Sequence, residues 1–150
     1  MTETPWPLTL GDGVTLDTSF VAPDGPPPAG GWPAALLVHG HGEDGTKAMT
    51  LDRARRLAGR GIAALSMSVR GQGASEGLSF HLGARELFDL CEVIDRLMAR
   101  PDVDAARVAV CGSSQGGSIS CVPSVATGSS TAKPGPAVAI STMWPSGSLV

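Results

Sequence analysis

Short apolar runs recur along the chain, and polar, glycine-rich segments separate them. Continuous apolar stretches cover residues 34–39 (AALLVH), 62–69 (IAALSMSV), 107–112 (RVAVCG) and 136–141 (PAVAIS). Runs of about four to eight apolar residues without alternation are typical of strands that are covered on both faces. The pattern therefore predicts four buried strands.

Longer segments between these runs carry apolar residues at helical spacing. The first is residues 47–59, with an apolar side formed by Leu51, Ala54, Leu57 and Ala58. The second is residues 82–98, with an apolar stripe formed by Leu87, Leu90, Cys91, Ile94, Leu97 and Met98. A third helix is expected to start at Gln115. Strands that alternate with helices predict an α/β fold with a mostly parallel sheet.

The N-terminal part follows a different pattern. Residues 8–21 contain a Gly-Asp-Gly turn at 11–13 and alternating apolar positions, which predicts a β-hairpin. Residues 22–33 are dense in proline and glycine and are expected to form a loop. We expect residues 1–150 to form a single domain.

Composition narrows the class of protein. The chain is 42% hydrophobic and 17% charged, which is typical of a globular domain. Its net charge is −3 and the arginines at 53–60 fit one solvated helix face, so nucleic acid is not an expected partner. We find no secretory signal and no apolar run long enough for a membrane span. The three cysteines then suggest reduced thiols in a cytoplasmic protein.

Three glycine-rich loops follow three of the predicted strands, and the carboxyl ends of parallel strands meet at one edge of a sheet. In the third loop, Gly112-Ser113-Ser114-Gln115-Gly116 has the spacing of a nucleophile elbow. Small residues on both sides let strand and helix approach, and Ser114 then projects from the sheet edge. The N–H of Gln115, at a helix start, is expected to face a developing oxyanion. Ser114 is therefore the candidate nucleophile.

The loop after the first buried strand begins His39-Gly40-His41-Gly42. In an acyl-transfer site this loop supplies the second oxyanion donor, which we expect to be the N–H of His41. Gly40 and Gly42 allow the loop to curl inward, and His39 is expected to hold the loop through ring hydrogen bonds.

A rival interpretation of the same loop is a metal site. His39 and His41, with Glu43 and Asp44 nearby, are ligand types that a divalent ion accepts. Arg70, in the second loop, is expected to tie loops together through its fork of donors rather than to bind a substrate anion.

Several motifs carry a family resemblance. The segments DGVTL, LLVHGHGED, VRGQGASEG, DVDAARVAVCGSSQGG and AVAIS make the chain resemble the N-terminal part of an α/β-hydrolase. They are similar to the Xaa-Pro dipeptidyl-peptidase-like and prolyl-oligopeptidase-like branch, and RGQ with GSSQGG also resembles the acetyl xylan esterase and cephalosporin C deacetylase branch. The resemblance implies helices on both faces of the sheet, Ser114 as nucleophile, and an oxyanion hole from His41 and Gln115. It implies hydrolysis of a small-molecule ester or peptide without a cofactor.

One feature departs from that pattern. In α/β-hydrolases an acid and then a histidine follow the serine, whereas residues 115–150 contain no Asp, Glu or His and Lys133 is their only charged side chain. We expect a truncated domain that lacks the C-terminal strands, so that turnover by this chain is in doubt. A substitute base among His39, His41 and His81, or a partner chain that supplies the base, are the alternatives.

Two other function classes stay open. The chain could be a non-catalytic fragment or interaction module that retains the fold, or a metallohydrolase that uses His39 and His41. A parallel sheet that stops early has an open edge, which predicts marginal stability or self-association.

Overall fold

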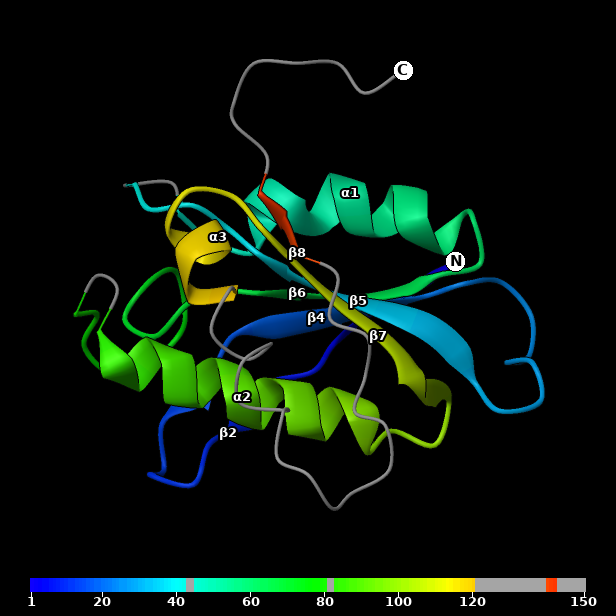
Figure 1. The fold of residues 1–150 in the computed structure, drawn as a ribbon, viewed down its shortest axis with the longest axis horizontal. Helices are drawn as coiled ribbons and strands as arrows, with labels where there is room; N and C mark the ends of the chain where they lie inside the picture. The colour runs from blue at the N-terminus through cyan, green and yellow to red at the C-terminus, as the bar shows by residue number, and fades with distance from the viewer. Residues whose placement is uncertain (43–44, 81–82, 121–139, 143–150) are drawn as a thin grey trace.

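A six-stranded sheet forms the centre of the computed structural model, which describes residues 1–42, 45–80, 83–120 and 140–142 (Figure 1). Its strands are β1 (Thr2–Pro5), β4 (Thr18–Ala22), β5 (Trp32–Val38), β6 (Ala63–Met67), β7 (Val103–Gly112) and β8 (Ile140–Thr142). They lie in the order β1-β4-β6-β5-β7-β8. β6, β5, β7 and β8 run parallel, whereas β1 and β4 pair antiparallel. The predicted α/β class with a mostly parallel sheet is confirmed.

Strand β5 lies in the middle of the sheet, between β6 and β7. Ala34, Leu36 and Val38 point into the core on one face, and Ala35 and Leu37 point into the core on the other. Because both faces of the strand are covered, the side chains on each face are apolar. Polar and apolar residues therefore do not alternate, and the strand is a continuous apolar run.

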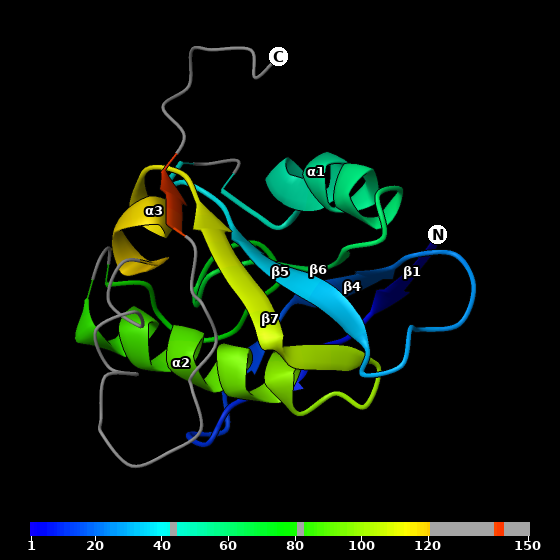
Figure 2. The ribbon, with the colours of Figure 1, turned by 45° about the vertical axis from the view of Figure 1, so that its right-hand side comes forward.

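Helices cover both faces of the sheet, as the family resemblance implied. α1 (Ala48–Ala58) packs on one face through Ala54 and Ala58, while α2 (Ala84–Met98) and α3 (Gln115–Ser120) lie on the other. Figures 1 and 2 show α1 and α2 on opposite sides of the sheet. The predicted helices at 47–59 and 82–98 agree with α1 and with the described part of the second segment.

The N-terminal hairpin is shorter than predicted. Only β2 (Leu8–Thr9) and β3 (Thr15–Leu16) pair as a hairpin, and residues 18–22 form β4 of the main sheet instead. The break falls at Asp17, whose N–H donates to Ser75 Oγ and whose carboxylate pairs with Lys47 at 2.5 Å. These contacts turn the chain from the hairpin into the sheet, which alternation alone did not reveal.

Two strands begin before their predicted ranges, β5 at Trp32 rather than residue 34 and β7 at Val103, and a third strand, β1, was not predicted. β1 was not expected, because its four residues are exposed and show no apolar pattern. β7 begins at Val103 rather than residue 107, since Val103 pairs with Trp32 across an irregularity in the β5 register. Of the predicted strand at 136–141, residues 136–139 lie outside the described residues, and 140–141 belong to β8.

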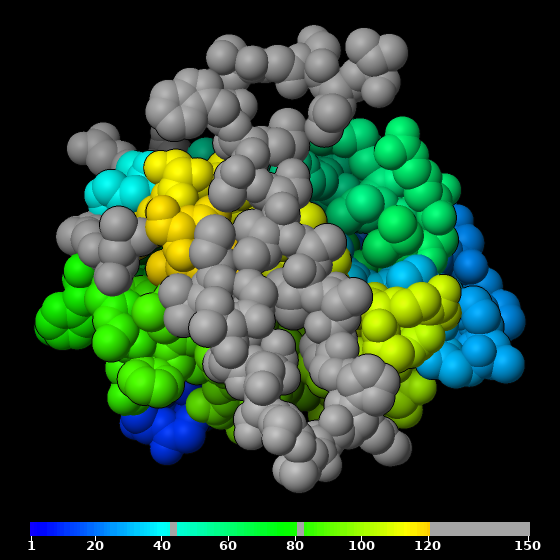
Figure 3. All heavy atoms as spheres, viewed as in Figure 1, coloured from blue at the N-terminus to red at the C-terminus, as the bar shows by residue number. Residues whose placement is uncertain are grey.

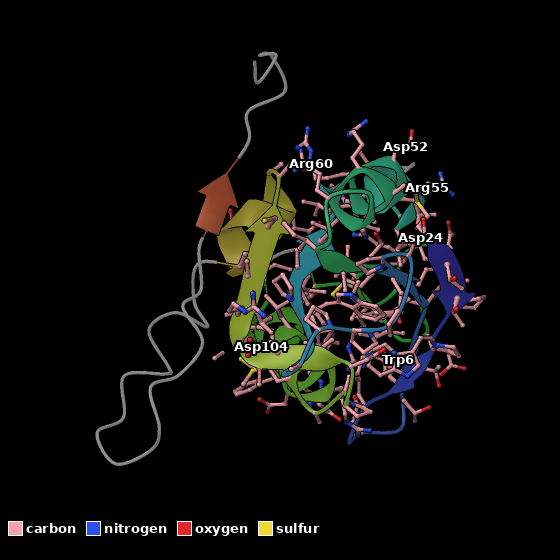
Figure 4. The ribbon with its side chains drawn as sticks, turned by 90° about the vertical axis from the view of Figure 1, so that its right-hand side faces the viewer. Trp6, Asp24, Asp52, Arg55, Arg60 and Asp104 are labelled. Atoms are coloured by element: carbon pink, nitrogen blue, oxygen red, sulfur yellow. The ribbon has the colours of Figure 1, made fainter. Side chains whose placement is uncertain are left out.

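The arginine-rich stretch lies on the outer side of α1. Arg55, Arg56 and Arg60 are exposed, and Arg55 pairs with Glu3 and Asp52. Figure 4 shows Asp52 and Arg60 directed away from the sheet, whereas Arg55 reaches Glu3 of the edge strand β1. None of the helices within the described segments is long and apolar enough to cross a membrane.

Candidate active site

The serine elbow lies between β7 and α3, at the carboxyl end of the parallel strands. Ser114 has φ 51°, and among the described residues it is the only non-glycine residue with a positive φ. Its side chain is exposed. A left-handed conformation at a residue with a Cβ carries strain, and such strain clusters at functional sites. A strand, a strained serine and a helix in this order have the geometry that a nucleophile elbow requires.

The glycines on either side of Ser114 occupy positions that have no room for a side chain. A Cβ on Gly112 would lie 2.3 Å from the backbone carbon and oxygen of Gly116. A Cβ on Gly116 would lie 2.5 Å from the carbonyl oxygens of Val38 and His39. These distances explain why both positions carry glycine, since α3 must start directly against β5 and β7.

The loop after β5 faces the elbow. A Cβ on Gly40 would lie 3.3 Å from Ser114 Cβ, so the two loops are in contact at this point. In the space-filling view the cyan loop after β5 borders the yellow and orange elbow segment (Figure 3). Gly42 has φ 153°, and its carbonyl accepts a hydrogen bond from the Gly45 N–H at 2.9 Å, which curls this loop.

His39 is fully buried beneath this loop, and both of its ring nitrogens have protein partners. Nε2 accepts the Val69 N–H at 3.0 Å, so Nδ1 carries the proton and donates to the Gly40 carbonyl at 2.7 Å. Burial lowers the pKa of His39, with a smaller contribution from His41, while the bond to Gly40 acts in the opposite direction. The neutral ring therefore joins the loops after β5 and β6.

This geometry bears on the metal alternative. Because its lone pair is used by Val69, His39 has none left for a metal ion or for a proton from Ser114. Within the described segments, no three His, Cys, Asp or Glu side chains gather as a metal site. Glu43 and Asp44, the other proposed ligands, lie outside the described residues.

Gln115 is the first residue of α3 and is 5% exposed. Its side-chain Oε1 lies 3.5 Å from Gln72 Nε2, and the same Nε2 lies 3.3 Å from Nδ1 of the exposed His41. Gln72 was not among the residues selected from the sequence. Its position beside Arg70 in the loop after β6 was the available signal, because that loop ends at the same sheet edge as the other two.

Arg70 lies in the loop after β6 and is buried. Its Nε and Nη2 donate to the Asp89 carboxylate on α2 at 2.6 and 2.7 Å, and Nη2 lies 3.0 Å from Asp12 Oδ2 in the hairpin turn. Its hydrogen bond to Asp89, opposed by burial and aided by Asp12, raises its pKa. Arg70 thus connects three segments, and carboxylates bind its Nε and Nη2 groups.

The hydrogen bonds of Ser114 with described residues use its carbonyl. It accepts the Ser118 N–H at 3.0 Å and Ser118 Oγ at 3.3 Å, as in an ordinary helical turn. His81 lies outside the described residues. Cys91 and Cys111 are half-buried free thiols, and burial raises the pKa of both.

Comparison with known families agrees with this arrangement. The family model of the X-Pro dipeptidyl-peptidases (S15 family) matches residues 12–147. The chain belongs to this family. The match runs from the hairpin turn, through all three loops, to beyond β8. No curated protein matches the sequence.

Solved structures with this architecture are α/β-hydrolases. An acetyl xylan esterase from Paenibacillus sp. R4 is 28% identical, with a TM-score of 0.58 over 73% of this chain and 40% of its own. An α/β serine hydrolase without a lid from Xanthomonas campestris is 24% identical, with a TM-score of 0.65 over 83% of this chain and 56% of its own. An α/β hydrolase from Penicillium sp. sh18 is 22% identical, with a TM-score of 0.68 over 80% of this chain and 40% of its own. The α/β-hydrolase fold is confirmed. The chain covers between 40% and 56% of the length of these structures.

Proposed function

We propose that this chain provides the nucleophile and the oxyanion hole of a serine hydrolase that cleaves a carboxyl ester or related acyl bond. The observation that carries the proposal is the strained conformation of Ser114, at an elbow that contacts the loop after β5. A residue held at this cost, in a family of hydrolases, is best explained by the chemistry of its side chain.

In the proposed reaction, Ser114 Oγ attacks the carbonyl carbon of the substrate and its proton passes to a base. The carbonyl oxygen gains negative charge and accepts hydrogen bonds from the N–H groups of His41 and Gln115. The bond to the leaving group then breaks, which leaves an acyl-enzyme that water hydrolyses. No cofactor takes part in these steps.

We infer that the base comes from polypeptide outside these 150 residues, with His41 and His81 as the alternatives within them. Residues 115–150 contain no Asp, Glu or His, and His39 is committed to two backbone partners. The solved relatives are about one and a half to two times as long as this chain, which supports a base from outside it. Removal of triad members leaves a residual rate of about 10³–10⁴ over water from the oxyanion hole and binding.

This division of labour favours activated esters as substrates of the chain by itself. A phenolate leaves without a proton, whereas the amine of a peptide bond leaves only after a general acid has protonated it. Acetyl and peptide substrates, suggested by the names of the relatives, are expected to need the complete machinery.

Labelling with a fluorophosphonate tests the proposal, because this reagent phosphonylates activated serines. We expect slow labelling of folded protein that is lost in Ser114→Ala and retained in Ser113→Ala, a matched control at the neighbouring serine. Absence of labelling in folded protein, or labelling that persists in Ser114→Ala, would contradict the nucleophile and favour the non-catalytic module.

A further inference from the structure

The side chains of the two proposed oxyanion donors are joined by one amide group. Gln72 Nε2 lies 3.3 Å from His41 Nδ1 and 3.5 Å from Gln115 Oε1. A carboxamide nitrogen carries two hydrogens, so it can donate one to each acceptor. Gln72 therefore lies between the loop after β5 and the start of α3, the two segments that supply the N–H groups.

The backbone of Gln72 is held in place on both sides. Its N–H donates to the Val69 carbonyl at 2.9 Å, and its own carbonyl accepts the Ser75 N–H at 3.1 Å. Gly71 and Gly73 flank it with φ values of 68° and 59°, which fit a tight turn that other residues seldom adopt. The side chain consequently extends from a fixed point toward the two donor segments.

The environment of the amide makes its orientation matter. Gln72 Oε1 and Gln115 Nε2 are both buried, and neither has a hydrogen-bond partner among the described residues. Gln72 Oε1 lies over Gly45, where a Cβ would come within 2.8 Å of it. Buried polar atoms without partners are costly. Loss of the two contacts of Gln72 Nε2 would leave further polar atoms unpaired, so we expect the amide to keep this orientation.

We propose that Gln72 is a positioning residue, which holds the His41 and Gln115 segments at the separation that the oxyanion hole requires. This inference rests on the proposed function. In the proposed reaction, Gln72 does not touch the substrate. It acts by limiting the movement of two N–H groups, and misplacement of catalytic groups by about 1 Å can lower a rate about 100-fold.

A thiol in place of the serine hydroxyl allows a test that does not depend on the missing base. In the Ser114→Cys variant of the 150-residue chain the thiolate attacks p-nitrophenyl acetate, an S–C bond forms, the ester C–O bond breaks and p-nitrophenolate leaves. With iodoacetamide the same thiolate forms an S–C bond and releases iodide, and no charge develops on a carbonyl oxygen. The ratio of the two rates therefore reports the oxyanion hole, and thiol exposure and thiol pKa cancel.

Both rates are measured by mass spectrometry of the peptide that contains position 114, which separates it from the native cysteines. Gln72→Glu keeps the size of the side chain but replaces the donor with a carboxylate oxygen that repels Gln115 Oε1. We expect acylation to fall about tenfold, less than the 10²–10³ lost when a donor is removed outright, with alkylation within about twofold. Leu78→Ala, at a 74% exposed side chain near the same loop, is expected to change neither rate.

The outcomes separate this inference from the proposed function. If the ratio of acylation to alkylation in Ser114→Cys is no higher than that of N-acetylcysteine, no oxyanion hole exists, and this result would overturn both. If the ratio in Ser114→Cys is higher than that of N-acetylcysteine and Gln72→Glu leaves it unchanged, the result would overturn the role of Gln72 alone. A parallel fall of both rates in Gln72→Glu would show a merely structural effect, and would also overturn it.

Discussion

Substitution of Gly116 by alanine provides a direct test of the packing at the elbow. Gly116 lies in α3, where alanine favours helix formation by about 1 kcal/mol over glycine. Propensity alone therefore predicts that Gly116→Ala stabilises the protein. The structure predicts the opposite, because the new Cβ would lie 2.5 Å from two carbonyl oxygens of β5 and its following residue.

The magnitude follows from what the clash can displace. Real Cβ contacts are not shorter than 3.0 Å, so the helix or strand has to move by at least about 0.5 Å. The atoms in the way are backbone atoms of a strand that is paired on both sides, and they have little freedom to yield. Overpacking costs about 1–3 kcal/mol, and a backbone clash belongs at the upper end of this range. After subtraction of the propensity gain, we expect a loss of about 2 kcal/mol in the free energy of unfolding.

Equilibrium unfolding in urea measures this quantity, with Ser118→Ala as the matched control. Ser118 is an exposed residue of the same helix, and its replacement is expected to change stability by less than about 0.5 kcal/mol. The Gly116→Ala protein is also expected to lose fluorophosphonate labelling, since a shift of α3 moves the Gln115 N–H. Equal or greater stability of Gly116→Ala than of the wild type would refute the packing argument.

Two further predictions concern buried charges and a buried histidine. Among the described residues, Asp89→Asn leaves the buried guanidinium of Arg70 with only Asp12 as an anionic partner, and we expect a loss of about 3 kcal/mol in the free energy of unfolding in urea. A loss below about 1 kcal/mol would exclude a structural role for the pair. Because burial lowers the pKa of His39 below its usual 6.5, the unfolded chain takes up a proton that the folded chain does not, and stability is expected to be full above about pH 6.5 and to fall as the pH drops below it. His39→Gln should abolish this part of the pH dependence and His41→Gln should retain it, and a slope that survives His39→Gln would exclude His39 as its source.

Much of the architecture could be predicted from the apolar pattern, for a physical reason. The central strands are covered by helices on both faces, so their sequences are apolar without interruption, and α1 and α2 show the spacing of a single buried side. β1 could not be found in this way, because it is exposed and is held by backbone pairing with β4. The split of residues 8–21 into a hairpin and β4 depends on Ser75 and Lys47, which are remote in sequence from Asp17.

The sequence by itself determined the α/β class and the elbow motif, and it showed that residues 115–150 lack a carboxylate and a histidine. These properties depend on local spacing and on side-chain chemistry, which can be read one segment at a time. Only the tertiary structure decided that His39 uses both ring nitrogens within the loops and that Gln72 lies between His41 and Gln115. The contacts between loops join residues that are 30 to 43 positions apart, and they exist only because parallel strands bring their carboxyl ends to one edge.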